Sequence, residues 1–347
     1  MVRYYRLEQK YKNNMIKDSI EIRLYAPVII TTLNRYDHFV ACLESLERCT
    51  GAQYTDVYVG LDYPPSEKYM EGWKKIDIYL RQKELSNSFK KLIVFRRDKN
   101  CGVGNSKSNS MLLFQYIMEH YDSFIATEDD NIFSENFLEF ENKGLQKFKD
   151  DETILAICGY CHPYRFKCLG NNYFFHQTDF SAWGYATWTD KYKKTFSEIQ
   201  GGFIKNSLSL KKIFMIKKYG YNRLFTFLLT AMHKGWIRMM DSVLAVYIQL
   251  KNYKVVVPTV TKVRNIGWDE AGQSFLNGMP KKYKEIAKRH KSQQIDILPY
   301  FNYEGDPMTY FDDNNLIAVD ESDGKISFFQ FCIDVFSVLL IWIKRRI

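Results

Sequence analysis

Acidic side chains end two apolar stretches of this sequence, and their positions predict a site for a metal and phosphate groups. The first stretch ends in Asp62, and residues 123–127 run directly into Glu128, Asp129 and Asp130. Three consecutive carboxylates concentrate negative charge that costs free energy unless a cation or solvent compensates it. Because Mn²⁺ and Mg²⁺ bind one or two carboxylates together with diphosphate oxygens, we predict a divalent metal here. A solvated acidic turn is the alternative interpretation.

Glycines and basic residues elsewhere in this half of the chain are candidates for phosphate binding. Gly102 and Gly104 precede a segment of helical spacing and would let backbone N–H groups approach a phosphate, with Lys107 adding positive charge. A Gly-x-Gly pattern is also frequent in ordinary loops. Arg35 follows another apolar stretch, at residues 25–32, and there it could face a nucleotide or the solvent.

The elements that would position these residues alternate between strand and helix patterns. The predicted strands cover residues 25–32, 57–62, 92–95, 123–127 and 153–158, and the predicted helices cover residues 37–49, 102–121 and a segment capped by Ser134. Strands joined by crossover helices predict an α/β fold with a mostly parallel sheet flanked by helices. In such folds ligands bind outside the carboxyl ends of the strands, where both acidic positions lie.

The second half of the chain is less regular. Its segments are an aromatic, turn-rich stretch at 160–190, a mainly helical stretch at 203–250, a short strand at 255–257 and a loop at 265–278. Trp183, Gly184 and Tyr185 are a candidate platform for a sugar ring, because the C–H faces of sugars pack on aromatic rings. Core packing is an equal alternative for the aromatic residues.

Composition narrows the classes of partner. The net charge of +9 favours phosphate-bearing ligands or an anionic surface, but the sequence lacks the concentrated basic block typical of a nucleic-acid-binding protein. Seven scattered cysteines do not form a paired framework, and the first 25 residues lack a signal-like apolar run, so we expect a reducing cytoplasm. Cys158 and Cys161 have the spacing of half a zinc site, and we interpret them as core residues.

The end of the sequence has a different character. Residues 326–343 are almost continuously apolar and precede Lys344, Arg345 and Arg346. On a helix this pattern leaves a narrow polar stripe. We therefore predict that residues 325–347 form an amphipathic helix that binds an anionic membrane surface through residues 326–346, with a docked helix or an oligomer contact as alternatives.

Several short motifs occur in a fixed order along the chain. They are residues 26–35 (APVIITTLNR), 100–104 (NCGVG), 126–131 (ATEDDN), 157–160 (ICGY), 183–188 (WGYATW) and 263–267 (VRNIG). In these motifs the sequence resembles bacterial sugar transferases of the GT-A fold and, more distantly, the N-acetylglucosaminyltransferase I group, whose metal motif is also Glu-Asp-Asp. The resemblance covers roughly residues 24–275 and implies a Rossmann-like α/β fold. The implied parts are an extension at 1–24, a nucleotide-sugar-binding half at 25–150 and an acceptor-binding half at 151–310.

The resemblance implies a role for each acidic residue. Asp62 would hydrogen-bond the uracil ring, and Glu128 and Asp129 would contact the nucleotide and its ribose. Asp130 would be the direct protein ligand of Mn²⁺ or Mg²⁺, which would stabilise the leaving nucleoside diphosphate. The resemblance also implies that Arg35 lies beside the uracil ring. Thr31, Asn34, Gly102 and Lys107 are our further candidates for nucleotide binding.

One position departs from the pattern of the family. Relatives often carry a histidine that helps to hold the metal or a phosphate, whereas this sequence has Gln273 or Ser274 at the corresponding place. Which residue completes the metal shell is therefore open.

An inverting transfer also requires a carboxylate that accepts the proton of the attacking hydroxyl. Asp241 is our candidate, because it lies in an apolar helical segment and its place in the chain order matches the acid of the related families. Capping of a helix start is the alternative role for Asp241. Asp179 and Asp190, which flank the tryptophan-rich motif, are the reserve candidates.

The resemblance and the acids together predict a glycosyltransferase, either a hexosyl- or an N-acetylhexosaminyltransferase. It would move a sugar from a UDP-sugar to a glycan or lipid-linked glycan, as in the biosynthesis of surface polysaccharide, at the inner face of the cell membrane. A sugar-phosphate nucleotidyltransferase is one alternative, but residues 34–36 lack the glycines of a triphosphate loop. A non-catalytic, membrane-associated glycan-binding scaffold is the other.

Overall fold

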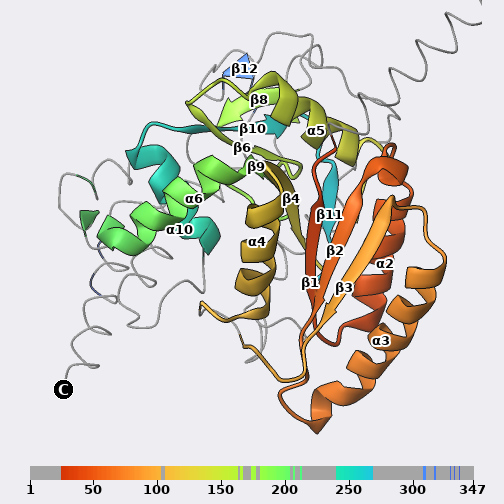
Figure 1. Cartoon of the computed structure of the whole chain (residues 1–347). Helices are drawn as coiled ribbons and strands as arrows, with labels where there is room; N and C mark the ends of the chain where they lie inside the picture. The colour runs from red at the N-terminus through yellow and green to blue at the C-terminus, as the bar shows by residue number, and fades with distance from the viewer. Residues whose placement is uncertain are drawn as a thin grey trace, which may run out of the picture.

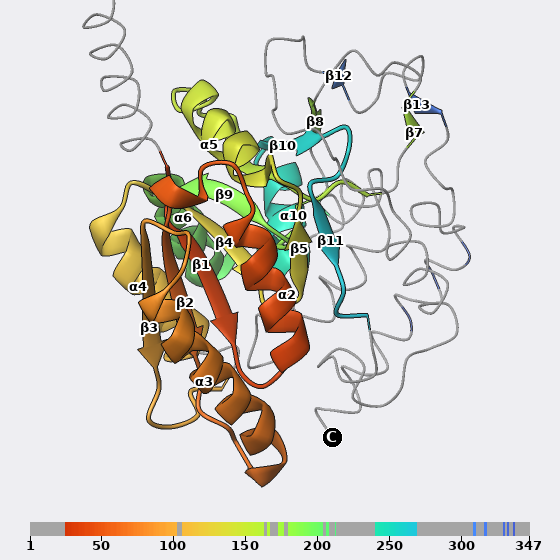
Figure 2. The same cartoon turned by 90° about the vertical axis from the view of Figure 1, so that its right-hand side faces the viewer.

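The computed structural model of the chain has a mixed nine-stranded sheet at its centre (Figures 1 and 2). The structure describes residues 25–102, 106–162, 165–166, 173–176, 180–203, 206–207, 212 and 240–268, together with 308–309, 316–317, 329, 332 and 336. In spatial order the strands are β12 (Met308–Thr309), β8 (Tyr173–His176), β10 (Lys254–Pro258), β6 (Ile154–Cys158), β9 (Tyr185–Trp188), β4 (Ser123–Glu128), β1 (Val28–Thr32), β2 (Asp56–Leu61) and β3 (Lys91–Arg96).

Parallel pairing dominates the half of the sheet that carries the acidic residues. β1 pairs in parallel with both β2 and β4, and β2 pairs in parallel with β3. β9 runs antiparallel between β4 and β6, and β8 runs antiparallel to β10. The carboxyl ends of β1 to β4 therefore meet at one edge, where side chains that follow these strands can converge.

Helices cover both faces of the sheet, which confirms the predicted α/β fold with a mostly parallel sheet. One face carries α2 (Tyr36–Glu47), α3 (Met70–Leu85) and α5 (Phe137–Lys147), and the other carries α4 (Asn109–His120), α6 (Thr189–Glu198) and α10 (Met240–Leu250). Figure 1 shows α4 and the α2–α3 pair on opposite sides of the strands. Among the described residues, no helix is long and apolar enough to cross a membrane.

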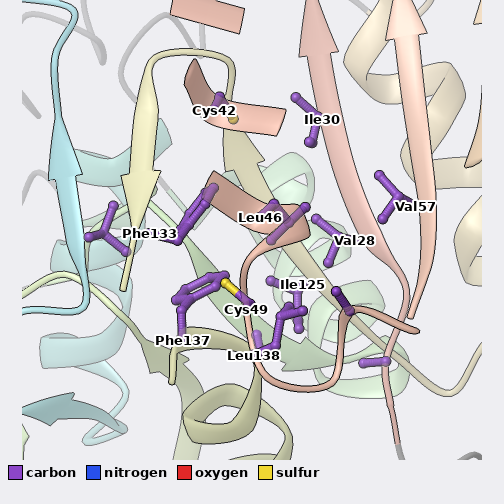
Figure 3. Close-up of a cluster of buried hydrophobic side chains, with 14 of the residues drawn as sticks. Val28, Ile30, Cys42, Leu46, Cys49, Val57, Ile125, Phe133, Phe137 and Leu138 are labelled. Carbon is purple, nitrogen blue, oxygen red and sulfur yellow. The ribbon is translucent and has the colours of Figure 1, made fainter. Parts of the chain in front are cut away.

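The alternation of side chains along the strands decides which face each residue covers. Val28 and Ile30 of β1 pack with Leu46 of α2 and Phe137 of α5 in the core of the α2 face (Figure 3). Ile29, the residue between them, belongs to the core of the α4 face instead. Strand residues therefore alternate between two apolar cores, and the same alternation directs the polar residues at the strand ends.

Two small ribbons complete the architecture. β5 (Asn131–Phe133) pairs antiparallel with β11 (Val263–Asn265), and β7 (Arg165–Phe166) pairs antiparallel with β13 (Leu316–Ile317). The β5–β11 ribbon directly follows β4 and its acids. It brings residues from late in the chain to the carboxyl edge of the sheet (Figure 2).

Several sequence predictions differ from the structure in detail. The predicted helix at 102–121 begins only at Asn109, where the hydroxyl of Ser108 accepts a hydrogen bond from the N–H of Met111 (3.4 Å). The prediction that Ser134 caps the next helix is wrong, because its hydroxyl donates to Asn136 Oδ1 (2.8 Å) and the helix begins at Phe137.

The aromatic stretch at 160–190 contains more regular structure than its turn residues suggested. Within it, β9 occupies a central place in the sheet, and β8 extends the sheet on the far side of β10. Cys158 and Cys161 are buried, as expected of core residues.

The N-terminal extension at 1–24 lies outside the described residues, and so do the tail at 325–347, apart from three positions, and most of the loop at 265–278.

Candidate functional site

The acidic positions predicted from the sequence lie together at the carboxyl edge of the sheet. β1 separates β2, which leads to Asp62, from β4, which leads to the acid run. Thr32, the last residue of β1, contacts both: its carbonyl accepts from the N–H of Asp62 (3.0 Å), and its hydroxyl donates to Asp129 Oδ2 (2.7 Å). One residue therefore connects the two halves of the site.

Asp62 is held by the loop that follows β3. Its side chain is buried, with the residue only 7% exposed, and its Oδ1 accepts from the N–H groups of Tyr63 and Cys101, both at 2.9 Å. Its Oδ2 accepts a longer hydrogen bond from Asn100 Nδ2 (3.3 Å), and the Cys101 thiol also hydrogen-bonds the carboxylate. Because a thiol is a weak donor, a ligand N–H could replace the Cys101 thiol at this carboxylate.

Asp130 is held on both of its carboxylate oxygens. Arg35 Nη1 lies 2.7 Å from Oδ2 in an ion pair, and Asn265 Nδ2 donates to Oδ1 at 2.6 Å. The N–H of Ile266 also bonds the Asp130 carbonyl at 2.8 Å. The β5–β11 ribbon therefore fixes Asp130 from one side, while Arg35 at the start of α2 supplies a cation from the other.

Gly267 lies against the Asp130 carboxylate more closely than any other residue type could. A Cβ at this position would lie 1.8 Å from Asp130 Oδ2 and 3.1 Å from Arg35 Nη1. The N–H of Gly267 is meanwhile bonded to Asn265 Oδ1 (3.0 Å). The absence of a side chain is thus what allows the 265–267 segment to pack on the acid.

Gly267→Ala should therefore displace the Asp130 carboxylate while leaving the two apolar cores intact. We expect metal-dependent binding of a nucleoside diphosphate to weaken by about 10–100-fold, the range typical when a residue that orients a metal ligand is lost. Gly201→Ala is the matched control, since a Cβ there would meet nothing within 4 Å. Titration calorimetry of both variants measures the effect, and equal affinities for the two variants would contradict it.

Glu128 faces the opposite side of the sheet edge from Asp129. It follows Phe124 and Ala126 of β4, which pack in the core of the α4 face. The side chain of Trp183 hydrogen-bonds its carboxylate, and Asp241 of α10 lies close enough to interact with it electrostatically. The structure therefore brings the predicted base, Asp241, and the predicted platform residue Trp183 to the acid run.

Burial raises the pKa of two acids in this run. Glu128 retains exposed surface, yet protein atoms crowd its carboxyl, and this desolvation, reinforced by Asp130 and Asp241, raises its pKa to about 8. Desolvation and the charge of Asp130 raise the pKa of Asp129 to about 6, although the Thr32 hydroxyl and Arg35 oppose the shift. The metal-free site therefore carries negative charge that the folded state disfavours.

These raised pKa values predict that the metal-free protein loses stability as the pH rises. The folded state binds protons more tightly than the unfolded chain, so the stabilising contribution is complete below about pH 4.5, the unfolded value for glutamate, and is lost as the pH approaches 8. We expect Tm to fall between pH 5 and 8 in the presence of a chelator, and Mn²⁺ to raise Tm more at pH 8 than at pH 5.

A glutamine at position 128 isolates the contribution of the carboxylate. In Glu128→Gln the fall of Tm between pH 5 and 8 should be smaller than in the unmodified chain. Glu119→Gln, which removes an exposed carboxylate from α4, is the matched control and should leave the slope unchanged. Scanning calorimetry across the pH range measures both slopes, and parallel slopes for all three proteins would show that Glu128 is not responsible.

The residues at this edge fit a metal ion that also uses oxygens of its substrate. Among the described residues, no three His, Cys, Asp or Glu side chains converge to form a closed metal cage. Mn²⁺ and Mg²⁺ commonly take only one or two protein carboxylates, together with waters and phosphate oxygens. Asp130 already holds a positive group on Oδ2, and Arg35, which supplies it, is long enough to move to a phosphate.

The predicted sugar platform divides into one partly exposed ring and two buried residues. Trp183 is partly buried and contacts the rings of Tyr160 (4.7 Å between centroids) and Trp268 (5.9 Å). Tyr185 is a core residue of the α4 face, packed on Phe180. Gly184 has a φ of 73°, and a Cβ there would press on Phe137. Only Trp183 of the three therefore presents an aromatic surface that a ligand could contact.

The other predicted nucleotide-binding residues lie around the same edge. Thr31 is paired in register with Gly60 and Glu128, and Asn34 lies in the following turn against α3. Gly102 has a φ of 66°, a conformation that favours glycine, and Lys107 is exposed one residue before the cap of α4. Gly104 lies outside the described residues.

The reserve candidates for the base do not reach this site. Asp190 lies two residues beyond Trp188, which pairs with Ser123 at the amino end of β4, so it is at the opposite edge of the sheet from Glu128. The structure therefore excludes Asp190 from the acid run. Asp179, Gln273 and Ser274 lie outside the described residues.

Several residues of the site were not predicted from the sequence. Thr32 and Asn265 each bond an acid, and Gly267 packs against Asp130. The motif at 263–267 was visible in the sequence, but its role depends on the pairing of β11 with β5. Arg97, which follows β3 directly, is another member of this edge that spacing alone does not identify.

Known proteins resemble the chain only in part. No family model and no curated protein matches it. The mannosyltransferase PcManGT from Pyrobaculum calidifontis, in complex with GDP-Man and Mn²⁺, is 11% identical with a TM-score of 0.30, over 50% of this chain and 46% of that one. TarS 1–349 of S. aureus is 14% identical with a TM-score of 0.31, over 49% of this chain and 48% of that one. Mouse xyloside xylosyltransferase 1, in its apo form, is 9% identical with a TM-score of 0.29, over 49% and 68%.

The chain thus spans less than half of the length of the mannosyltransferase and of TarS. Two of the three structures are named as sugar transferases, and one of them holds GDP-Man and Mn²⁺. The function proposed below is argued from the side chains at the carboxyl edge of the sheet.

Proposed function

We propose that this chain is a metal-dependent glycosyltransferase whose donor is a nucleoside-diphosphate sugar, with a UDP-sugar as the favoured donor. It would move the sugar to a hydroxyl group of a glycan or lipid-linked glycan. The observation that carries the proposal is the meeting of Asp62, the acid run and Asp241 at one sheet edge. This reaction needs an acidic residue that binds the nucleobase, a cation that binds the phosphates and a further carboxylate.

The nucleotide would lie along the carboxyl ends of β2, β1 and β4. Asp62 would accept a hydrogen bond from the nucleobase in place of the weak one from the Cys101 thiol. Asp130 would hold Mn²⁺ or Mg²⁺, which supplies positive charge to the departing diphosphate. The Arg35 guanidinium would move from Asp130 to a phosphate oxygen, a contact that its geometry favours.

Transfer with inversion requires a base on the side of the sugar away from the diphosphate. Asp241 is supported in this role by its position on α10 beside Glu128, because both lie on the α4 face while Asp129 lies on the α2 face. The raised pKa of Glu128, about 8, would keep that neighbour largely protonated at neutral pH before a cation binds. Asp241 would then accept the proton of the acceptor hydroxyl.

The competing functions predict different site chemistry. A sugar-phosphate nucleotidyltransferase would bind a triphosphate at the turn after β1, where residues 33–36 contain no glycine. A glycan-binding scaffold would not need Asp130 and Arg35 to be poised beside Asp62. The paired arrangement of base-binding and phosphate-binding groups favours the transferase.

The experiment is a panel of UDP-, GDP- and TDP-sugars tested for slow hydrolysis with Mn²⁺ and with a chelator. We expect release of UDP from at least one UDP-sugar only when Mn²⁺ is present. Release of pyrophosphate from UTP and a sugar phosphate would indicate the nucleotidyltransferase instead. A scaffold would give no turnover and no metal-linked nucleotide binding.

We also propose that the enzyme works at the inner face of the cell membrane, held there by residues 326–346. The sequence pattern of these residues supports the proposal, since an amphipathic segment ends in three basic residues. Co-sedimentation with vesicles rich in anionic lipid tests it. Binding that is unchanged after deletion of residues 326–346 would refute the assignment.

A further inference from the structure

Arg97 lies beside Asp62 on the same face of the sheet. The parallel register of β2 and β3 pairs Gly60 with Phe95, and the N–H of Arg97 continues the ladder by bonding the Leu61 carbonyl (3.0 Å). Because side chains alternate along a strand, Arg97 follows Phe95 and Asp62 follows Gly60 onto the α4 face. The Arg97 guanidinium accordingly lies over the Phe95 ring, 5.7 Å from its centroid.

A hydrogen-bond relay through the buried Asn109 amide fixes the direction of this guanidinium. Arg97 Nε donates to Asn109 Oδ1 (2.9 Å), and Asn109 Nδ2 donates to the Gly60 carbonyl (2.7 Å). Asn109 is only 5% exposed, and a Cβ at Gly60 would lie 2.8 Å from its Oδ1. The glycine therefore makes room for the amide, and the amide orients the arginine.

Arg97 and Asp62 are neighbours of opposite charge that do not form an ion pair within the described structure. Asp62 is occupied on Oδ1 by two backbone N–H groups, and Arg97 uses only Nε. Neither Nη atom of Arg97 has a hydrogen-bond partner among the described residues. By contrast, the adjacent Arg96 is fully engaged, with Asp77 through Nε and with Glu84 through both Nη atoms. Arg97 thus presents two oriented donors next to an acceptor.

We propose that Arg97 and Asp62 together read the edge of the nucleobase. Asp62 accepts a hydrogen bond from the ring N3–H, and Arg97 donates to the C4 carbonyl oxygen next to it. Uracil presents this N–H and C=O pair, whereas cytosine presents a ring nitrogen acceptor and an amino donor at the same positions. The pair therefore selects uracil over cytosine, two bases of equal size. This inference rests on the proposed function, because it assumes that a nucleotide occupies the edge.

The test is titration of UDP and of CDP, each with Mn²⁺, into the unmodified chain, Arg97→Met and the control Arg96→Met. We expect the unmodified chain to prefer UDP by at least about tenfold, since a hydrogen bond to a charged group is worth that much or more. Arg97→Met should lose about tenfold in UDP affinity without losing CDP affinity. Arg96→Met removes the same charge from the same strand end and should keep the preference.

Arg97→Lys provides a second variant that retains the charge. A lysine lacks the forked donors of arginine and cannot bond Asn109 and the nucleobase at once. The preference for UDP should therefore fall again, although the attraction between the positive charge and the phosphates of the nucleotide is unchanged. Equal weakening of UDP and CDP in Arg97→Met, or an unchanged preference in both variants, would overturn the inference alone. If the unmodified chain binds neither nucleotide, the proposed function falls, and this inference falls with it.

Discussion

Asp130→Ala is expected to abolish the metal-dependent part of donor binding. In the described structure this carboxylate is the meeting point of Arg35, Asn265 and the Gly267 backbone, so its loss leaves a cation and an amide without their acceptor. Loss of residues that only orient a ligand typically costs about 10–100-fold in metal affinity, and loss of the ligand itself should exceed about 100-fold. Titration of UDP with and without Mn²⁺ measures the effect.

Two controls separate this effect from a general loss of structure. Asp122→Ala removes an exposed acid just before β4, at the other end of the same strand, and should bind Mn²⁺ and UDP normally. Asp130→Asn preserves the size of the side chain but not its charge, and should fail to bind the metal while retaining a cooperative unfolding transition. If Asp130→Ala still shows Mn²⁺-dependent UDP binding of ordinary strength, the metal lies elsewhere.

Asp241→Asn is the second large effect, and it should separate binding from chemistry. The amide has nearly the size of the acid but cannot accept the proton of the attacking hydroxyl. We therefore expect UDP affinity to change little and sugar transfer to fall by about 10²–10⁴-fold, the usual contribution of a general base. Single-turnover transfer with a saturating donor, measured beside donor titration, distinguishes the two quantities.

Asp190→Asn is the matched control for this prediction. Asp190 is also an acid in the first turn of a helix, but it lies at the opposite edge of the sheet. Its variant should transfer sugar at the ordinary rate. Ordinary transfer by Asp241→Asn would show that Asp241 is not the base, whereas loss of both binding and transfer would indicate a structural role for its carboxylate.

The main features of the fold were predictable because each strand carries its own local signal. The apolar stretches that became β1, β2 and β4 are short and rich in β-branched residues, and segments of helical spacing lie between them. Asp62 and Glu128 could be placed at one edge because parallel strands share the direction of their carboxyl ends. The position of these acids therefore follows from patterns only a few residues long.

The supporting contacts were not predictable because they depend on pairing between distant segments. Asn265 bonds Asp130 across 135 residues of sequence, and only the β5–β11 register brings them together. The central place of β9 likewise depends on antiparallel pairing on both of its sides, which its aromatic sequence does not specify. Arg97 is similar, since its partner Asn109 lies on the next helix and its neighbour Asp62 on the next strand.

The measurement that tests the account most directly is titration of UDP into the unmodified chain with Mn²⁺ and with a chelator. Under the proposed function, the acids and Arg35 beside Asp62 should bind the diphosphate strongly only when a hard cation joins them. We predict clear heat of binding with Mn²⁺ and at least about a tenfold loss of affinity in the chelator. Equal UDP affinity under both conditions, or no binding in either, would contradict the proposed site.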